Sequence, residues 1–123
     1  MDEVKVEERG WPGHFGRAHQ CYFTRNTLLS YNGIDLVVST IGDYYPDGLE
    51  GGMKPISRDS YYETMVFYAG KTEYKDSDTA RGEIFTKRTL KDDDLAGNRM
   101  HEEVVTLFKE RLLKNDLSRK RRK

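Results

Sequence analysis

The sequence predicts an α+β fold: an antiparallel β-sheet core of about five or six strands, followed by a C-terminal helical extension. The first observation is that short β-rich runs, separated by glycine, proline and asparagine, fill the chain up to about residue 90. The second is that the apolar period then changes to three and four residues, which is typical of an amphipathic helix. We expect a single α+β ligand-binding domain over residues 1–115 and a basic flexible tail over residues 116–123.

The early strands are predicted from alternation and from one turn. Residues 4–7 alternate with period two, and residues 20–23 predict a short second strand. Asn32-Gly33 separates two further β-rich runs, at residues 27–31 and 34–40. Because both central positions of a type I′ turn need positive φ, this pair predicts a tight hairpin.

The second half of the chain predicts a loop, two strands and the helix. Residues 42–59 hold four glycines and two prolines and predict a long loop. Residues 61–69 predict an aromatic strand covered on both faces, and residues 82–88 return the chain as another strand. Aspartates at 92–94 suit a helix N-terminus. The helix is predicted to end near residue 115 and to carry an apolar stripe of Met100, Val104, Leu107, Phe108 and Leu112.

Composition limits the classes of protein and partner. The formal net charge is zero, but the last five residues are all basic, so the rest of the chain carries 16 basic and 21 acidic residues. A body of net charge about −5 argues against a nucleic-acid-coating protein.

The single cysteine excludes an internal disulfide and a cysteine-rich zinc site. Without a signal-like or membrane-spanning apolar run, we expect a soluble cytoplasmic protein with no membrane partner. Its mean hydropathy of −0.85, with many aromatic rings, suggests burial between subunits.

One stretch of the chain lacks acids altogether. No Asp or Glu occurs between Arg9 and Ile34, although the chain has 21 acids. The stretch holds five potential cations interleaved with aromatic residues: Arg9, His14, Arg17, His19 and Arg25. Such cations repel one another unless an anion or a distant acid comes close. The pattern favours a site for an anionic ligand that carries phosphates and rings. The alternative is that neutral strands have few acids and the arginines reach water.

Catalysis and metal binding have little support, so we expect no enzyme, no metal site and no cofactor. The histidines lack the i,i+4 spacing of a helical zinc pair, and no phosphate-loop or serine-elbow motif occurs. On the helix, His101 lies on the apolar stripe, either as a satisfied core histidine or as a ligand group. Arg111 borders the same stripe, either packing past Phe108 or facing a partner across an interface. Phe85 is either a core ring or a platform for a base.

The chain also resembles a family of small phage and prophage proteins, the anti-Thoeris sponge group, which sequesters bacterial immune signals. The resemblance covers about residues 5 to 113 and is carried by these phrases: Arg9-Gly10-Trp11-Pro12-Gly13-His14-Phe15, Arg25-Asn26-Thr27-Leu28-Leu29, Val37-Val38-Ser39-Thr40, Tyr61-Tyr62-Glu63-Thr64-Met65 and Met100-His101-Glu102. It implies a β-sheet core whose C-terminal helix forms a homodimer, and higher assembly from such dimers. It implies a host bacterial cytoplasm as the location.

The implied ligands are cyclic ADP-ribose isomers, bound and not degraded, with cyclic oligonucleotides at a separate second site. The resemblance places arginines on phosphates and a ring on the adenine. It has no clear counterpart for the acidic stretch at 91–94. On this basis we expect a ligand-binding set of Arg25, Asn26, Phe85, Asn98, His101 and Arg111, with Arg58 at the second site.

Two other functions stay open from the sequence. A phage inhibitor would bind a host defence protein directly through its acidic surface, which the charge of the body favours. A small phosphodiesterase would use His14 and His101. Incubation with a cyclic ADP-ribose isomer separates these functions from sequestration, because only the enzyme converts the isomer.

Overall fold

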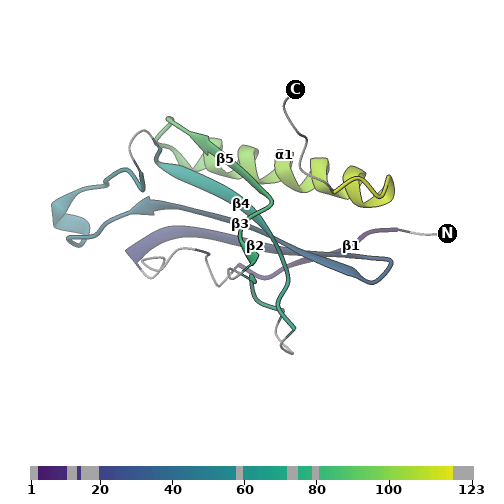
Figure 1. The fold of residues 1–123 in the computed structure, drawn as a ribbon. Coiled ribbons are helices and arrows are strands. Elements are labelled where there is room, and N and C mark those ends of the chain that lie inside the picture. Colours follow the sequence, from purple (N-terminus) through teal and green to yellow (C-terminus); the bar gives the residue numbers. More distant parts are fainter. Residues whose placement is uncertain are drawn as a thin grey trace, which may run out of the picture.

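The computed structural model describes residues 3–10, 14, 20–57, 60–71, 75–78 and 81–117. Five strands form one antiparallel sheet in the order β1-β2-β3-β4-β5, and a long helix packs against one face of it (Figure 1). This confirms the predicted α+β fold. The elements are β1 Lys5–Glu8, β2 Cys21–Tyr31, β3 Ile34–Tyr44, the short 3-10 helix η2 Leu49–Gly51, β4 Tyr62–Tyr68, β5 Phe85–Thr89 and α1 Asp94–Leu113.

The Asn-Gly hairpin is formed as predicted, and it joins two longer strands than expected. Asn32 and Gly33 have φ values of 52° and 82°, which are the positive angles of a type I′ turn. The two separate runs predicted at 20–23 and 27–31 are one continuous strand, paired with β3 from Cys21 to Tyr31. The polar residues Arg25 and Asn26 do not interrupt it, because their side chains find partners on either face of the sheet. The long loop consequently begins after Tyr44, and not at residue 42.

The helix begins and ends close to the predicted residues. The Asp93 carboxylate accepts a hydrogen bond from the Ala96 amide at 2.8 Å, and so caps the first turn. The helix ends at Leu113, and Asn115 adopts φ 53°, a left-handed angle that terminates helices. No helix in the described part of the chain is long and apolar enough to cross a membrane.

The apolar stripe of α1 is buried within the protomer. Phe108 has no exposed surface and packs into a cluster formed with the sheet, whose buried members are Leu29, Leu36, Val38, Val66, Val104, Val105, Phe108 and Leu112. Of the five stripe residues, four are buried and Leu107 is 37% exposed. The width of the stripe therefore gives no argument for a helix-mediated dimer, because one sheet covers nearly all of it.

Tyr62 fills a slot between the sheet and the helix that depends on two glycines. Its ring is buried against Gly42 of β3 and Gly97 of α1, and its hydroxyl donates to Asp94. A Cβ atom at Gly97 would lie 2.7 Å from the ring, and one at Gly42 would lie closer still. Both positions require the absence of a side chain.

We predict that Gly42→Ala lowers the free energy of unfolding by about 1–3 kcal/mol, because the added methyl group overpacks a buried site. Urea denaturation measures the loss. Gly97→Ala tests the same contact inside the helix. Replacement of glycine by alanine in a helix would by itself stabilise the protein by roughly 0.5–1 kcal/mol, so a loss of stability in this variant comes from the clash with the Tyr62 ring. In the Tyr62→Leu background both losses should shrink. Full additivity of Gly42→Ala with Tyr62→Leu would show that the ring is not the obstacle.

Candidate anion-binding site

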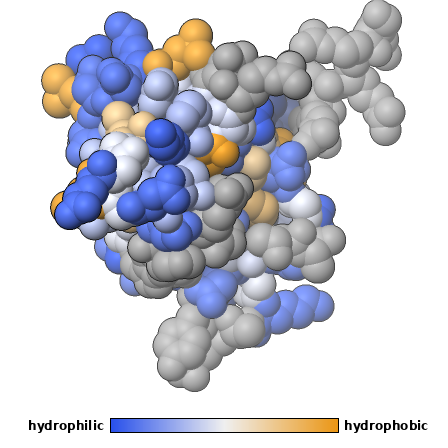
Figure 2. Space-filling view, turned by 90° about the vertical axis from the view of Figure 1, so that its left-hand side faces the viewer, coloured by the Kyte–Doolittle hydropathy of each residue, from blue (hydrophilic) through white to orange (hydrophobic). Residues whose placement is uncertain are grey.

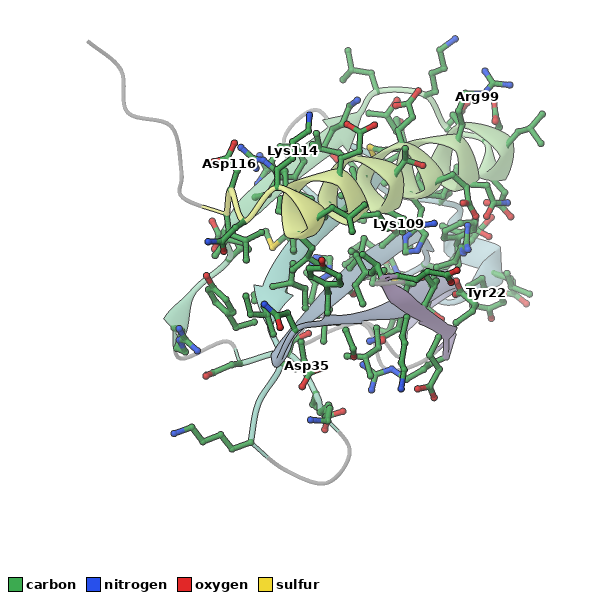
Figure 3. The ribbon with its side chains drawn as sticks, turned by 90° about the vertical axis from the view of Figure 1, so that its right-hand side faces the viewer. Tyr22, Asp35, Arg99, Lys109, Lys114 and Asp116 are labelled. Atoms are coloured by element: carbon green, nitrogen blue, oxygen red, sulfur yellow. The ribbon has the colours of Figure 1, made fainter. Side chains whose placement is uncertain are left out.

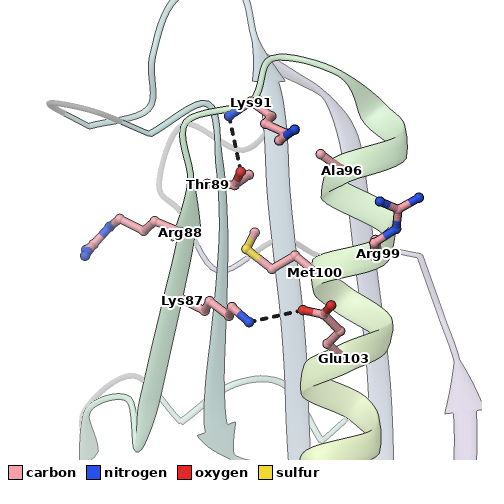
Figure 4. A pocket seen from close by; sticks show the side chains of 8 residues that line it. All are labelled: Lys87, Arg88, Thr89, Lys91, Ala96, Arg99, Met100 and Glu103. Atoms are coloured by element: carbon pink, nitrogen blue, oxygen red, sulfur yellow. Dashed lines mark hydrogen bonds and ion pairs between the residues drawn. The ribbon is translucent and has the colours of Figure 1, made fainter.

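A cavity of about 200 Å³ lies between β5 and the first half of α1 (Figure 4). Strand alternation places Lys87 and Thr89 on the helix side of β5, while Ala96, Met100 and Glu103 follow one another along a single face of α1. Met100 is buried and supplies apolar surface between the two elements. The cavity is lined by Lys87, Arg88, Thr89, Lys91, Ala96, Arg99, Met100 and Glu103.

The charges around this cavity are not balanced. Lys87 Nζ lies 3.1 Å from Glu103 Oε1, so one cation is matched across the cavity. The Arg88 guanidinium points away in Figure 4, and its Nε donates to Glu63 at 2.7 Å. Within the described part of the chain, Lys91 and Arg99 form no ion pair. Two unmatched cations beside an apolar wall can bind an anion that carries phosphate.

Arg25, by contrast, is already matched by carboxylates of its own chain. Its Nη2 lies 2.6 Å from Glu8 Oε1, and its Nη1 lies 2.7 Å from Glu102 Oε2. Burial tends to raise the pKa of Glu8, but hydrogen bonds from Arg25 and Thr27 hold it below its ordinary value. His14 likewise lies 3.1 Å from Glu63. Two basic residues of the acid-free stretch therefore pair with acids that are distant in the sequence. For Arg25 and His14 the structure thus shows the distant acid that was one alternative from the sequence.

His101 is fully buried and belongs to a hydrogen-bonded chain through the core. Thr27 Oγ1 donates to Glu8 Oε1 at 2.7 Å, so it accepts from His101 Nε2, also at 2.7 Å. The Nε2 atom therefore carries the ring proton, and Nδ1 accepts from Thr40 at 2.6 Å. Thr64 in turn donates to Thr40 at 2.5 Å. Each threonine hydroxyl in this series of hydrogen bonds donates to one partner, so its orientation is fixed. The series ends at the Glu8 carboxylate.

The neutral state of His101 follows from this environment. Burial, and then the nearby Arg25 guanidinium, lower the pKa of His101 to about 4, while Glu8 and Glu102 partly oppose the shift. The imidazole is consequently uncharged near neutral pH, in agreement with the hydrogen-bond directions. The structure thus shows the core histidine that was one alternative from the sequence. A ligand role for His101 stays a prediction.

The opposite face of the sheet carries a second polar cluster. His14 Nδ1 lies 2.8 Å from Ser39 Oγ, and its Nε2 lies 3.1 Å from Glu63 Oε1. The Glu63 carboxylate accepts from Nε2, so the ring lies between a serine hydroxyl and a carboxylate, as in a serine–histidine–carboxylate triad with the ring nitrogens exchanged. Ser39 has no exposed surface, so a substrate cannot reach its Oγ in this arrangement. The cluster holds His14 against the sheet.

This placement argues against the phosphodiesterase that would pair His14 with His101. His14 contacts Ser39, whereas His101 contacts the next residue, Thr40. Successive residues of a strand point to opposite faces, so the sheet separates the two histidines. They cannot act on one substrate within a protomer.

The remaining predicted residues lie in several parts of the molecule. Asn26 is buried on the His14 side of the sheet and accepts from Arg9 Nε at 2.8 Å. Phe85 packs edge-on against Phe108, with ring centroids 5.3 Å apart. The Arg111 guanidinium lies over the Phe108 ring at 5.1 Å, which is the packing alternative expected from the sequence. Asn98 is exposed on the helix, and Arg58 lies outside the described residues.

The structure does not bring Arg25 and Arg111 together within one protomer. Arg25 pairs with Glu102, and Arg111 follows Glu102 by nine positions along the helix. This separation corresponds to about 13 Å along the helix and to about two and a half turns, so the two positions face opposite ways. One ligand phosphate could contact both arginines only if the second came from another copy of the chain. Their shared ligand role stays a prediction.

The sequence reasoning missed Lys91 and Arg99. A signal was present, because residues 86–91, which precede the three aspartates at the start of the helix, hold three basic residues and no acid. The neighbouring aspartates at 92–94 predicted a helix N-terminus and gave no indication of a basic site. Comparison of the chain with protein families, curated proteins and solved structures finds no match. The geometry described above therefore carries the functional argument.

The lowered pKa of His101 predicts a specific loss of stability in acid. An unfolded histidine binds a proton below pH 6.5, whereas folded His101 does so only below about pH 4. Between these values the unfolded state binds more protons, so stability falls as pH decreases through the window, by about 3 kcal/mol in all. His101→Gln, which keeps an amide donor and acceptor, should flatten this part of the profile. Equal slopes for both proteins in urea titrations from pH 7 to pH 4 would contradict the assignment.

Proposed function

We propose that this protein binds a small phosphate-bearing ligand without degrading it, and that it acts in a host bacterial cytoplasm by sequestering a cyclic nucleotide signal of the cyclic ADP-ribose type. The observation that carries the proposal is the pair Lys91 and Arg99, which line a cavity next to buried Met100 and form no ion pair among the described residues. The ligand class comes from the sequence resemblance, and the pocket supplies chemistry that suits it.

The size of the cavity supports a phosphate-bearing part of a ligand more than a whole dinucleotide. Its volume of about 200 Å³ is below the roughly 300–1,000 Å³ that is usual for pockets enclosing a drug-sized ligand. No aromatic ring lines it, but Leu90 and Leu95, beside lining residues in the sequence, are 68% and 70% exposed. Figure 2 shows isolated hydrophobic groups among hydrophilic ones on this end of the molecule. Such groups suit the apolar face of a base next to a bound phosphate.

Binding without turnover is supported by the kind of groups that line the cavity. Ammonium and guanidinium groups stabilise phosphate charge but do not abstract protons at neutral pH. The carboxylate present, Glu103, is paired with Lys87. Both histidines that the structure describes, His14 and His101, are hydrogen-bonded elsewhere through both ring nitrogens. These features favour a binder over a hydrolase.

The test is incubation with cyclic ADP-ribose, followed by filtration, heat denaturation and chromatography of the released ligand. Sequestration predicts that the protein depletes the ligand from solution and that heating returns it intact. A new chromatographic product would make the protein an enzyme. Failure to deplete cyclic ADP-ribose and its isomers would overturn the proposal and favour direct inhibition of a host protein.

We predict that Lys91→Ala and Arg99→Ala each weaken binding of cyclic ADP-ribose about ten- to a hundredfold, because each removes a charge-assisted contact of roughly 1.5–3 kcal/mol. Calorimetric titration measures the change. Lys109→Ala is the matched control, since Lys109 is an exposed cation on the same helix, ten residues beyond Arg99 (Figure 3). It should retain wild-type affinity.

Arg111→Ala separates this cavity from the site implied by the resemblance. If the ligand phosphate sits between β5 and α1, loss of the Arg111 guanidinium should affect stability slightly and affinity not at all, because that group lies over Phe108. If Arg111→Ala abolishes binding while Lys91→Ala and Arg99→Ala leave it unchanged, the phosphate is bound in a pocket that includes Arg111, and the cavity assignment is wrong.

A further inference from the structure

The outer edge of β1 is arranged for pairing with another strand. β1 is the first strand of the sheet and is paired to β2 on one side, with its opposite edge forming no ladder among the described residues. All four of its residues are exposed, and Val6 is 48% exposed. Lys5 and Glu7 form no ion pair in the described part of the chain. An exposed edge strand presents unpaired N–H and C=O groups to another strand, and the short length and charges of β1 restrict that pairing to a partner of complementary charge.

The direction of the backbone groups in β1 can be derived from its ladder with β2. The Arg9 amide donates to the Asn26 carbonyl at 2.6 Å, so this is a hydrogen-bonded pair. In an antiparallel ladder such pairs alternate, so Glu7 and Lys5 also direct their amides and carbonyls toward β2. The amides and carbonyls of Val6 and Glu8 therefore point outward, away from the sheet.

We propose that two copies of this protein associate through β1, with Val6 opposite Val6 of the second copy on a two-fold axis. In this register the outward amide and carbonyl of Val6 exchange hydrogen bonds with their symmetry equivalents. Lys5 then faces the second copy's Glu7, and Glu7 faces its Lys5. These are non-hydrogen-bonded pairs, in which opposing Cα atoms are only about 4.5 Å apart and side chains approach closely. The charges along β1 complement themselves in this one register.

A groove beside β1 gives the facing side chains room. A cavity of about 490 Å³ runs along the strand and is lined by Glu3, Val4, Lys5, Val6, Glu7, Leu28 and Ser30. The side chains of Lys5 and Glu7 lie on the face of the sheet that lines this cavity. In the proposed dimer, Lys5 and Glu7 of the second copy would lie along the same face, where the cavity leaves space for them. In Figure 3 β1 is the purple strand, which is the edge strand of the sheet. A pairing of two short strands buries little area, so the dimer should be weak and concentration-dependent.

Sedimentation velocity over a wide range of protein concentration tests the proposal. The wild-type protein should shift from monomer to dimer as concentration rises. Glu7→Lys and Lys5→Glu should each remain monomeric at concentrations where the wild type is dimeric, because each places like charges opposite one another. The double variant Lys5→Glu/Glu7→Lys restores opposite charges and should dimerise as the wild type does.

Mixing the two single variants gives the sharpest outcome. The Glu7→Lys chain presents lysines at positions 5 and 7, and the Lys5→Glu chain presents glutamates at both, so an equimolar mixture should form a heterodimer although neither variant self-associates. A folding defect cannot produce this rescue. A wild-type protein that stays monomeric throughout, or a dimer that both single variants retain, would overturn the proposal. The second result would move the interface to another surface, such as α1.

Discussion

The structure depends on one buried histidine and the hydroxyl groups around it. His101 hydrogen-bonds α1 to two strands in the buried core, because its two ring nitrogens contact Thr27 of β2 and Thr40 of β3. Apolar packing alone would let a helix slide along a sheet, since dispersion contacts are not directional. Two charge-neutral hydrogen bonds in opposite directions fix both the height and the rotation of the helix. The same placement brings Glu102 to Arg25 and Phe108 over the apolar cluster.

This constraint also explains how the chain tolerates so much buried polarity. The hydroxyls of Thr27, Thr40 and Thr64 are each satisfied by a neighbour, and the chain of donors ends at the Glu8 carboxylate. Buried polar groups cost little when every donor and acceptor is paired, and much when one partner is lost. Arg25 completes the arrangement by neutralising Glu8 at the surface. The polar core is therefore one connected network, which runs from the middle of the sheet to its edge.

The fold was predictable because its signals are local. The positive φ of Asn32-Gly33 and the change from period two to the helical period each depend on a few consecutive residues. The ion pairs were not predictable, because they join positions such as Glu8, Arg25 and Glu102 that only the folded sheet brings together. For the same reason the stretch without acids left open whether a ligand or a distant acid lies beside its cations. The cavity lies between two elements whose relative position depends on the long-range contacts of His101.

Lys91 and Arg99 differ from Arg25 and His14 in their acidic partners. Arg25 and His14 show that the fold supplies distant carboxylates to cations that it uses structurally. Lys91 and Arg99 sit close in sequence to three aspartates, yet Asp93 caps the helix and Asp94 accepts from the Tyr62 hydroxyl. Two of the three aspartates thus hold the helix, and Lys91 and Arg99 lie beside the cavity without an ion pair among the described residues. Other surface cations of the described chain, such as Lys5 and Lys109, also form no ion pair, so it is the position of Lys91 and Arg99 beside the cavity and buried Met100 that supports the proposal of an anionic ligand.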